Sequence, residues 1–154
     1  MTRFSLGILL AAVLFMLAGC GDSHDLATPE ETGVLKVATR NGATTYYLDR
    51  HETPAGPEFD LTRRFAEAQG WEIEWSVFDS TSQVLEALES GKVHLAAAGL
   101  TRLPSRDQRF TPGPSHTDIV EQLVCHRDMR PLPRQLEELT DVEIRVTAAS
   151  SCWE

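Results

Sequence analysis

The sequence predicts an α/β domain built on a parallel β-sheet, placed behind an N-terminal export segment. Between residues 34 and 100, apolar runs with strand character alternate with amphipathic helical segments. Each helical segment is long enough to return the chain to the same end of the sheet, so successive strands run parallel. The run at 93–100 is almost entirely apolar, which is typical of a strand covered on both faces.

The first segment has the features of a secretory signal. Arg3 precedes an apolar run at 4–17, and the tetrad Leu17–Cys20 closes that run with small residues. The run is shorter than the stretch of about 20 apolar residues that spans a bilayer. A buried helix would show a polar face, and this run has none. We therefore expect residues 1–19 to be a signal peptide that is removed.

The remaining elements follow from periodicity, capping residues and turns. Residues 20–33 are polar and turn-rich, and we expect a tether without a fold of its own. Ser80 and Gln83 fit a capping box at the start of a helix. The predicted elements are a strand at 34–39, a loop at 49–57, a helix at 58–69 that buries Phe59, Leu61, Phe65 and Ala68 and stops at Gly70, a strand at 71–78, a helix from Ser80 to Gly91, strands at 93–100 and 119–126, a short helix at 134–139, and a strand at 142–148.

The charge balance and the cysteines narrow the function classes. The chain has 23 acidic and 14 basic residues, a net charge of −9, which argues against nucleic acid or an anionic membrane surface as a partner. Cys125 and Cys152 could form a bridge in an oxidising compartment, or Cys125 could simply be buried. The five histidines are scattered without ligand spacing, so we expect no metal site and no cofactor.

A carboxylate pocket is predicted beyond the carboxyl ends of the strands, where open α/β sheets bind ligands. Pro104 opens a helical turn that carries Arg106, and an arginine can grip a carboxylate with two N–H groups. Paired tyrosines after the first strand would form an aromatic wall. A solvated arginine and ordinary packing tyrosines are the alternatives. The candidate ligand-binding residues are Tyr46, Tyr47, Gly99, Leu100, Thr101 and Arg106.

No residue pattern indicates catalysis in these 154 residues. Paired carboxylates could act as an acid and a base in glycoside cleavage, but each pair falls on a predicted solvent face or helix start. The serine pair at 150–151 lacks a histidine and acid context. The pairs considered are Glu58/Asp60, Glu72/Glu74 and Glu137/Glu138.

The tetrad Leu17–Cys20 resembles the lipobox of bacterial lipoproteins. This resemblance implies that Cys20 is lipidated and becomes the first residue of the mature chain, so that the membrane is contacted through lipid. An aspartate directly after the lipidated cysteine resembles an inner-membrane retention signal, and here Asp22 stands one place later. We therefore expect a lipid-anchored protein on the periplasmic face of the envelope, with the outer membrane favoured over the inner.

Residues 33–150 resemble bacterial extracellular solute-binding proteins of the polar amino-acid type, through segments 56–61, 88–95, 101–106 and 110–114. The chain is still more similar to the N-terminal half of the membrane-bound lytic murein transglycosylase F family. The segments that carry this resemblance are Val37–Asn41, Thr45–Tyr47, Ala96–Thr101, and Arg130–Pro133 before Leu136–Leu139. Two departures are His94, where the family usually has aspartate, and Ser115-His116, where proline-tyrosine is common.

The resemblance implies a periplasmic-binding-protein-like fold, with a complete first lobe at 34–118 and a truncated second lobe at 119–154. It also implies a missing C-terminal lysozyme-like domain, so we expect the chain to be a fragment. The implied role is a regulatory domain that binds an amino-acid or cell-wall peptide carboxylate for an enzyme of peptidoglycan turnover. The alternatives are a stand-alone binding lipoprotein of an amino-acid ABC transporter and a non-functional truncated product.

Overall fold

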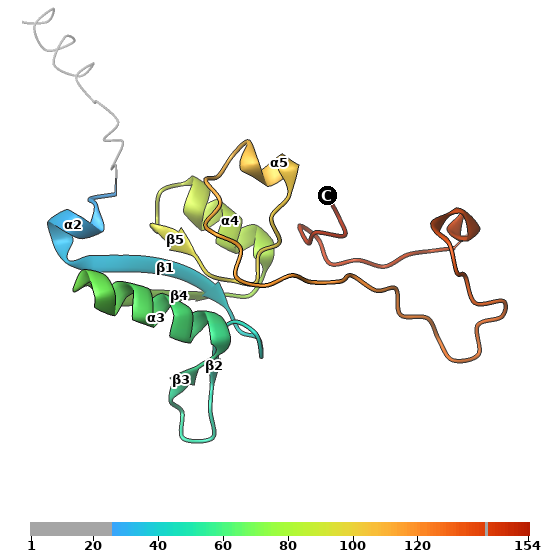
Figure 1. The fold of residues 1–154 in the computed structure, drawn as a ribbon, viewed down its shortest axis with the longest axis horizontal. Helices are drawn as coiled ribbons and strands as arrows, with labels where there is room; N and C mark the ends of the chain where they lie inside the picture. Colours follow the sequence, from blue (N-terminus) through green and yellow to red (C-terminus); the bar gives the residue numbers. More distant parts are fainter. Residues whose placement is uncertain (1–25, 141) are drawn as a thin grey trace, which may run out of the picture.

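The computed structural model describes residues 26–140 and 142–154 (Figure 1). The predicted signal peptide, the predicted lipidation site Cys20 and the first part of the predicted tether lie outside the described residues. The elements are α2 (Pro29–Thr32), β1 (Val34–Arg40), β2 (Tyr47–Leu48), β3 (Pro54–Ala55), α3 (Pro57–Gln69), β4 (Glu72–Phe78), α4 (Thr81–Glu89), β5 (Leu95–Ala96), α5 (Pro104–Asp107) and the 3₁₀-helix η1 (Leu136–Leu139).

A parallel sheet with the order β4-β1-β5 organises the first part of the chain. Successive side chains of β1 point to opposite faces. Val37 packs with Ala66 of α3, and Ala38 packs with Val84 of α4. The two helices therefore cover opposite faces of the sheet (Figure 1). This arrangement confirms the predicted α/β class with parallel strands.

The ends of both long helices follow the predicted signals. Gly70 stops α3 with a φ of 75°, and its N–H donates to the carbonyls of Ala66 and Glu67. Ser80 Oγ accepts from the Gln83 N–H at 3.2 Å, so Ser80 is the N-cap of α4. The Gln83 side chain accepts from the Asp79 N–H at 3.1 Å. In a capping box the Gln83 side chain would accept from the N–H of Ser80 itself, so the observed contact lies one residue earlier than predicted.

The buried face of α3 differs from the prediction. The predicted side-chain set is only partly covered, because Leu61 is 50% exposed and Phe65 is 48% exposed, and Ala68 is also exposed. The residues that face the sheet are Glu58, Thr62 and Ala66. Residues four positions apart share one face of a helix, so burial of Glu58, Thr62 and Ala66 turns Leu61 and Phe65 away from the buried face.

The predicted tether and loop contain short regular structure. The segment at 29–32 forms α2, and the Thr28 N–H donates to the Glu31 carboxylate at 3.0 Å. His94 connects this segment to the sheet, since Nδ1 accepts from the Lys36 N–H and Nε2 lies 2.9 Å from the Ala27 carbonyl oxygen. The loop predicted at 49–57 is the end of an antiparallel hairpin made by β2 and β3.

Three predicted strands are shortened or not formed. The strand predicted at 93–100 is confined to β5, because only Val37 and Ala38 offer it partners. The predicted strands at 119–126 and 142–148 are not strands in the described chain, and Val124 is 95% exposed. An extended segment becomes a strand only when a neighbouring segment satisfies its backbone groups. The predicted helix at 134–139 is the short 3₁₀-helix η1.

Cys125 and Cys152 are free thiols, so the bridge considered from the sequence is not formed. Within residues 26–140 and 142–154, no helix has the length and apolar character needed to cross a bilayer.

Candidate carboxylate-binding site

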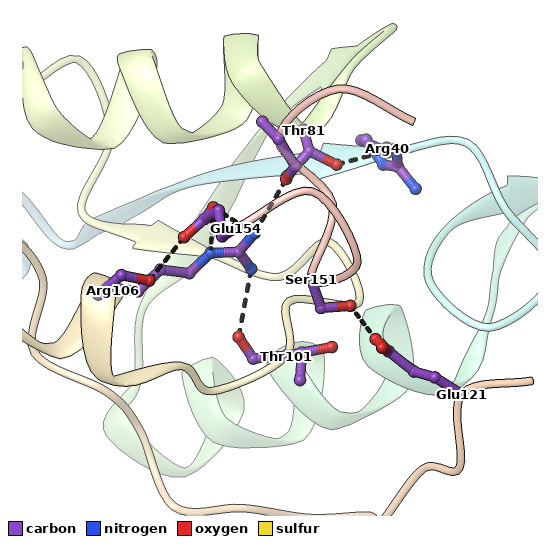
Figure 2. Close-up of polar contacts among 9 residues, drawn as sticks. Arg40, Thr81, Thr101, Arg106, Glu121, Ser151 and Glu154 are labelled. Atoms are coloured by element: carbon purple, nitrogen blue, oxygen red, sulfur yellow. Dashed lines mark hydrogen bonds and ion pairs between the residues drawn. The ribbon is translucent and has the colours of Figure 1, made fainter. Parts of the chain in front are cut away.

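Arg106 holds a carboxylate of the chain itself. It lies on α5, is only 7% exposed, and donates from Nε at 3.0 Å and from Nη2 at 2.8 Å to Oε1 of Glu154. Figure 2 shows this paired contact, with Arg106 reaching out from α5 toward the segment that carries Glu154. A rigid planar guanidinium that gives two N–H groups to one anion is the geometry expected of a carboxylate site.

The other polar groups around this contact complete the site. Ser105 Oγ donates to the second oxygen of Glu154 at 2.8 Å. The Arg106 guanidinium is held from behind, since Nη1 donates to the Thr101 carbonyl at 3.2 Å and Nη2 to the Ala149 carbonyl at 2.9 Å. The hydrogen bonds from Arg106 and then from Ser105 hold the pKa of the Glu154 carboxyl below its ordinary value.

The loop Gly99–Thr101 links this site to the sheet. Gly99 has a φ of 66°, and a Cβ there would lie 3.2 Å from Thr45 Cγ2. Its N–H donates to Oε2 of Glu58 at 2.8 Å. Leu100 packs against the α4 side of the core. Of the predicted trio, Thr101 touches Arg106 through its carbonyl oxygen, and Gly99 and Leu100 shape the loop.

Glu58 is a buried carboxylate beneath this loop. Burial raises its pKa above the ordinary value of 4.5, while the Gly99 N–H and, less strongly, His116 oppose that rise. The His116 Nε2 atom lies 3.7 Å from Glu58 Oε1, and the histidine side chain is 50% exposed. His116 stands where the resembled family commonly has tyrosine, so this chain places there a side chain that is positively charged when protonated.

The two tyrosines are placed differently from Arg106. Tyr46 packs in an aromatic cluster with Phe59 and Trp75, at ring-centroid distances of 5.8 and 5.7 Å. Tyr47 lies on β2 and is 37% exposed. In the described chain, no hydrogen bond or cation–π contact joins either tyrosine to Arg106. Tyr46 therefore packs as an ordinary aromatic residue in this structure, and a role of the tyrosines as the wall of a ligand pocket stays a prediction.

Arg40 was not among the predicted site residues. It ends β1, and its Nη1 donates to Thr81 Oγ1 at 3.0 Å (Figure 2). Its Nε is buried and has no hydrogen-bond partner in the described chain, and no carboxylate of that part forms an ion pair with it. An arginine at the carboxyl end of a buried strand was the sequence signal that could have marked it.

The segment 149–154 is fixed beside α5 by further contacts. Ser151 donates to Glu121, as Figure 2 shows, and Cys152 Sγ lies 3.2 Å from Oε2 of the same carboxylate. Residues 101–106, 121 and 149–154 are thus brought together from distant parts of the sequence. Glu121 and Glu154 could not be marked in advance, because their hydrogen-bond partners lie 30 or more positions away in the chain.

A parallel α/β lobe with an anion-binding arginine beyond its strands is consistent with a solute-binding domain. Residues 35–143 match the model of bacterial extracellular solute-binding proteins, family 3, and the chain belongs to that family. This match and the sheet topology confirm the predicted fold class.

Within this family, the chain is similar to membrane-bound lytic murein transglycosylases F, which confirms the resemblance described from the sequence. It is 52% identical to membrane-bound lytic murein transglycosylase F 2 of Alkalilimnicola ehrlichii over 97% of this chain and 34% of that protein. It is 37% identical to the transglycosylase F of Maricaulis maris over 93% of this chain and 33% of that protein. The chain thus spans about a third of the length of these relatives.

Among solved structures, the chain is similar to the arginine-bound form of domain 1 from TmArgBP, with a TM-score of 0.49 and 18% identity, over 54% of this chain and 66% of that one.

Proposed function

We propose that this chain is the lipid-anchored, regulatory solute-binding part of a murein transglycosylase that acts in cell-wall turnover. The similarity to transglycosylases F over nearly the whole chain supports this assignment. The chain itself would bind a ligand and perform no chemistry. Anchoring through Cys20, on the periplasmic side of the outer membrane, belongs to the same proposal.

The contact between Arg106 and Glu154 is the observation that carries the ligand class. The Glu154 carboxylate stands in for the carboxylate of an amino acid or a cell-wall peptide. An external carboxylate in its place would receive N–H groups from Arg106 and the hydroxyl of Ser105. Charge-assisted hydrogen bonds of this kind are about twice as strong as neutral ones.

Arg40 favours a ligand that carries a second acidic group. β1 and β5 are parallel neighbours, so Arg40 ends at the same edge of the sheet as the chain that leads to Arg106. A partly buried guanidinium without a carboxylate partner is costly, and an incoming anion would offset that cost. A ligand with two carboxylates would then contact Arg106 with one and Arg40 with the other.

Calorimetric titration with L-glutamate, L-glutamine and D-alanyl-D-alanine tests the ligand class. We expect Arg106→Gln to weaken the binding of each probe by at least about tenfold, since it removes a charge-assisted pair worth roughly 1.5–3 kcal/mol. Arg102→Gln is the matched control, because Arg102 is 65% exposed and pairs with Asp107 on the surface. Absence of binding of all three probes at millimolar concentration would overturn the proposed ligand class.

The same titration tests Arg40. We expect the protein to prefer L-glutamate to L-glutamine and Arg40→Gln to abolish that preference while both probes still bind.

The reading frame after codon 154 tests the assignment to a transglycosylase. A lysozyme-like domain encoded there supports it, and a transport gene beside the chain would favour the transporter alternative.

A further inference from the structure

Glu58 connects helix α3 to the loop that leads to Arg106. The Glu58 side chain is 11% exposed, and its Oε2 accepts the Gly99 N–H at 2.8 Å. Two residues further on, the Thr101 carbonyl accepts from Arg106 Nη1 at 3.2 Å. The same three-residue loop is therefore held by Glu58 at one end and contacts the guanidinium at the other.

The other neighbours of Gly99 are uncharged. Thr45 lies against Gly99, and the Thr45 carbonyl accepts the Phe59 N–H at the start of α3 at 3.1 Å. An ionised carboxylate makes a stronger hydrogen bond to an N–H group than a neutral carbonyl does. The Glu58 contact is thus the one in this cluster whose strength depends on a proton.

We propose that Glu58 is a positioning residue of the carboxylate site, which in its ionised form holds the Gly99–Thr101 loop in the conformation that supports Arg106, and that His116 extends this hold to lower pH. The inference rests on the proposed function only for the identity of the ligand. The contact by which Glu58 holds the loop, called the hold below, is present in the chain without ligand.

The pH dependence follows from the groups that face Glu58. Burial raises the pKa of Glu58, so its carboxylate takes up a proton at a higher pH than an exposed glutamate and the charge-assisted bond to Gly99 is then lost. On α3 itself, Arg63 is paired with Asp60 and Glu67. From outside α3, the His116 ring faces Glu58, with Nε2 at 3.7 Å from Oε1. A protonated His116 lowers the pKa of Glu58, because its positive charge favours the ionised carboxylate.

Amide NMR of the labelled protein without ligand tests the proposal. We expect the Gly99 amide proton to move with pH through a midpoint above 4.5, the ordinary glutamate value, and the Thr101 amide and Arg106 Nε–H resonances to move through the same midpoint. His116→Gln should raise that midpoint, because the substitution removes a nearby positive charge that lowers the pKa of Glu58. His126→Gln is the matched control, since His126 is 78% exposed and lies beside Asp128.

Each outcome decides between the alternatives. A Gly99 amide that does not titrate, or that titrates unchanged in Glu58→Gln, overturns the hold by Glu58. Thr101 and Arg106 resonances that stay still while Gly99 moves overturn the positioning role. An unchanged midpoint in His116→Gln removes His116 from the proposal. The measurement on the unsubstituted protein decides the first two points even if Glu58→Gln fails to fold. A titrating loop in a protein that binds none of the three probes would refute the proposed function and leave the hold intact.

Discussion

The Arg106 side chain combines burial, charge and donor geometry in one place. Its guanidinium is buried, yet every nitrogen has an acceptor in Glu154, Thr101 or Ala149. A buried guanidinium without an anion would be strongly unfavourable, so the site needs either Glu154 or a ligand carboxylate. This requirement makes Glu154 a competitor for the ligand.

Glu154→Gln tests this competition. We expect the substitution to tighten the binding of L-glutamate several-fold, because the ligand then displaces a neutral amide from Arg106 and not a charged carboxylate. Calorimetry at neutral pH measures the change. Glu143→Gln is the matched control, because Glu143 pairs with the exposed Arg145. Equal affinity in the original protein and in Glu154→Gln would show that Glu154 does not compete.

The sequence marked Arg106, which contacts the Glu154 carboxylate, but not the residues around it, and binding of an external ligand there stays a prediction. Arg106 could be singled out because Pro104 opens a turn there and arginine suits carboxylates. Tyr46 could not be placed, since a tyrosine after a strand serves equally as a ligand wall or as a partner of Phe59 and Trp75. Glu58 looked like a solvated residue at a helix start, because the loop that buries it comes 41 positions later in the chain.

Local capping governs the ends of the elements. Ser80→Ala removes the acceptor for the Gln83 N–H at the start of α4, and we expect it to lower the free energy of unfolding by about 1 kcal/mol. Urea denaturation measures this change. Ser82→Ala is the matched control, because Ser82 is exposed within the same helix, and alanine has the higher helix propensity. Equal losses in both variants would contradict the role of the cap.

Gly56 is required by a close approach between two backbones. Its φ is 136°, and a Cβ there would lie 2.3 Å from the Thr45 carbonyl oxygen. We expect Gly56→Ala to lower the free energy of unfolding by roughly 2–4 kcal/mol, since backbone strain adds to a clash with atoms that cannot rotate away. Gly70→Ala isolates the strain, because Gly70 has a φ of 75° and nothing within 4 Å of the added atom.

A loss of about 1–2 kcal/mol is expected for Gly70→Ala from left-handed backbone alone. If urea denaturation gives the same loss for both variants, the close approach of Gly56 to Thr45 does not constrain the structure.

Across the elements, patterns that depend on neighbours in the chain were predictable, and patterns that depend on distant partners were not. The helix α3 ends at Gly70 and α4 begins at Ser80, as expected. The C-cap of α4 is Ser90, one residue before the expected Gly91. The strands β1 and β4 occupy their expected runs. The run at 119–126 has strand composition, but strand formation needs a partner that composition does not supply. The exposure of Leu61 and Phe65 likewise depends on which face of α3 is buried.

Among the described residues, regular structure is concentrated in the parallel sheet and the two helices that cover it. Leu35, Val37 and Ala38 of β1 are buried, whereas apolar residues at 119–124 are largely exposed, with Val120 at 85% and Val124 at 95%. Segments with few buried contacts and no ladder hydrogen bonds open at low free-energy cost. Stability should therefore differ sharply between the first lobe and the segment that follows it.

Hydrogen exchange followed by NMR or mass spectrometry measures this difference. We expect the amides of β1 that bond to β4 and β5 to exchange only by global opening, and the amides of 119–126 and 142–148 to exchange close to the rate of an unfolded chain. Comparison at two protein concentrations is the control, since exposed segments of strand composition can pair between copies. Protection of 119–126 at low concentration would contradict the unpaired conformation, and protection that grows with concentration would show pairing between molecules.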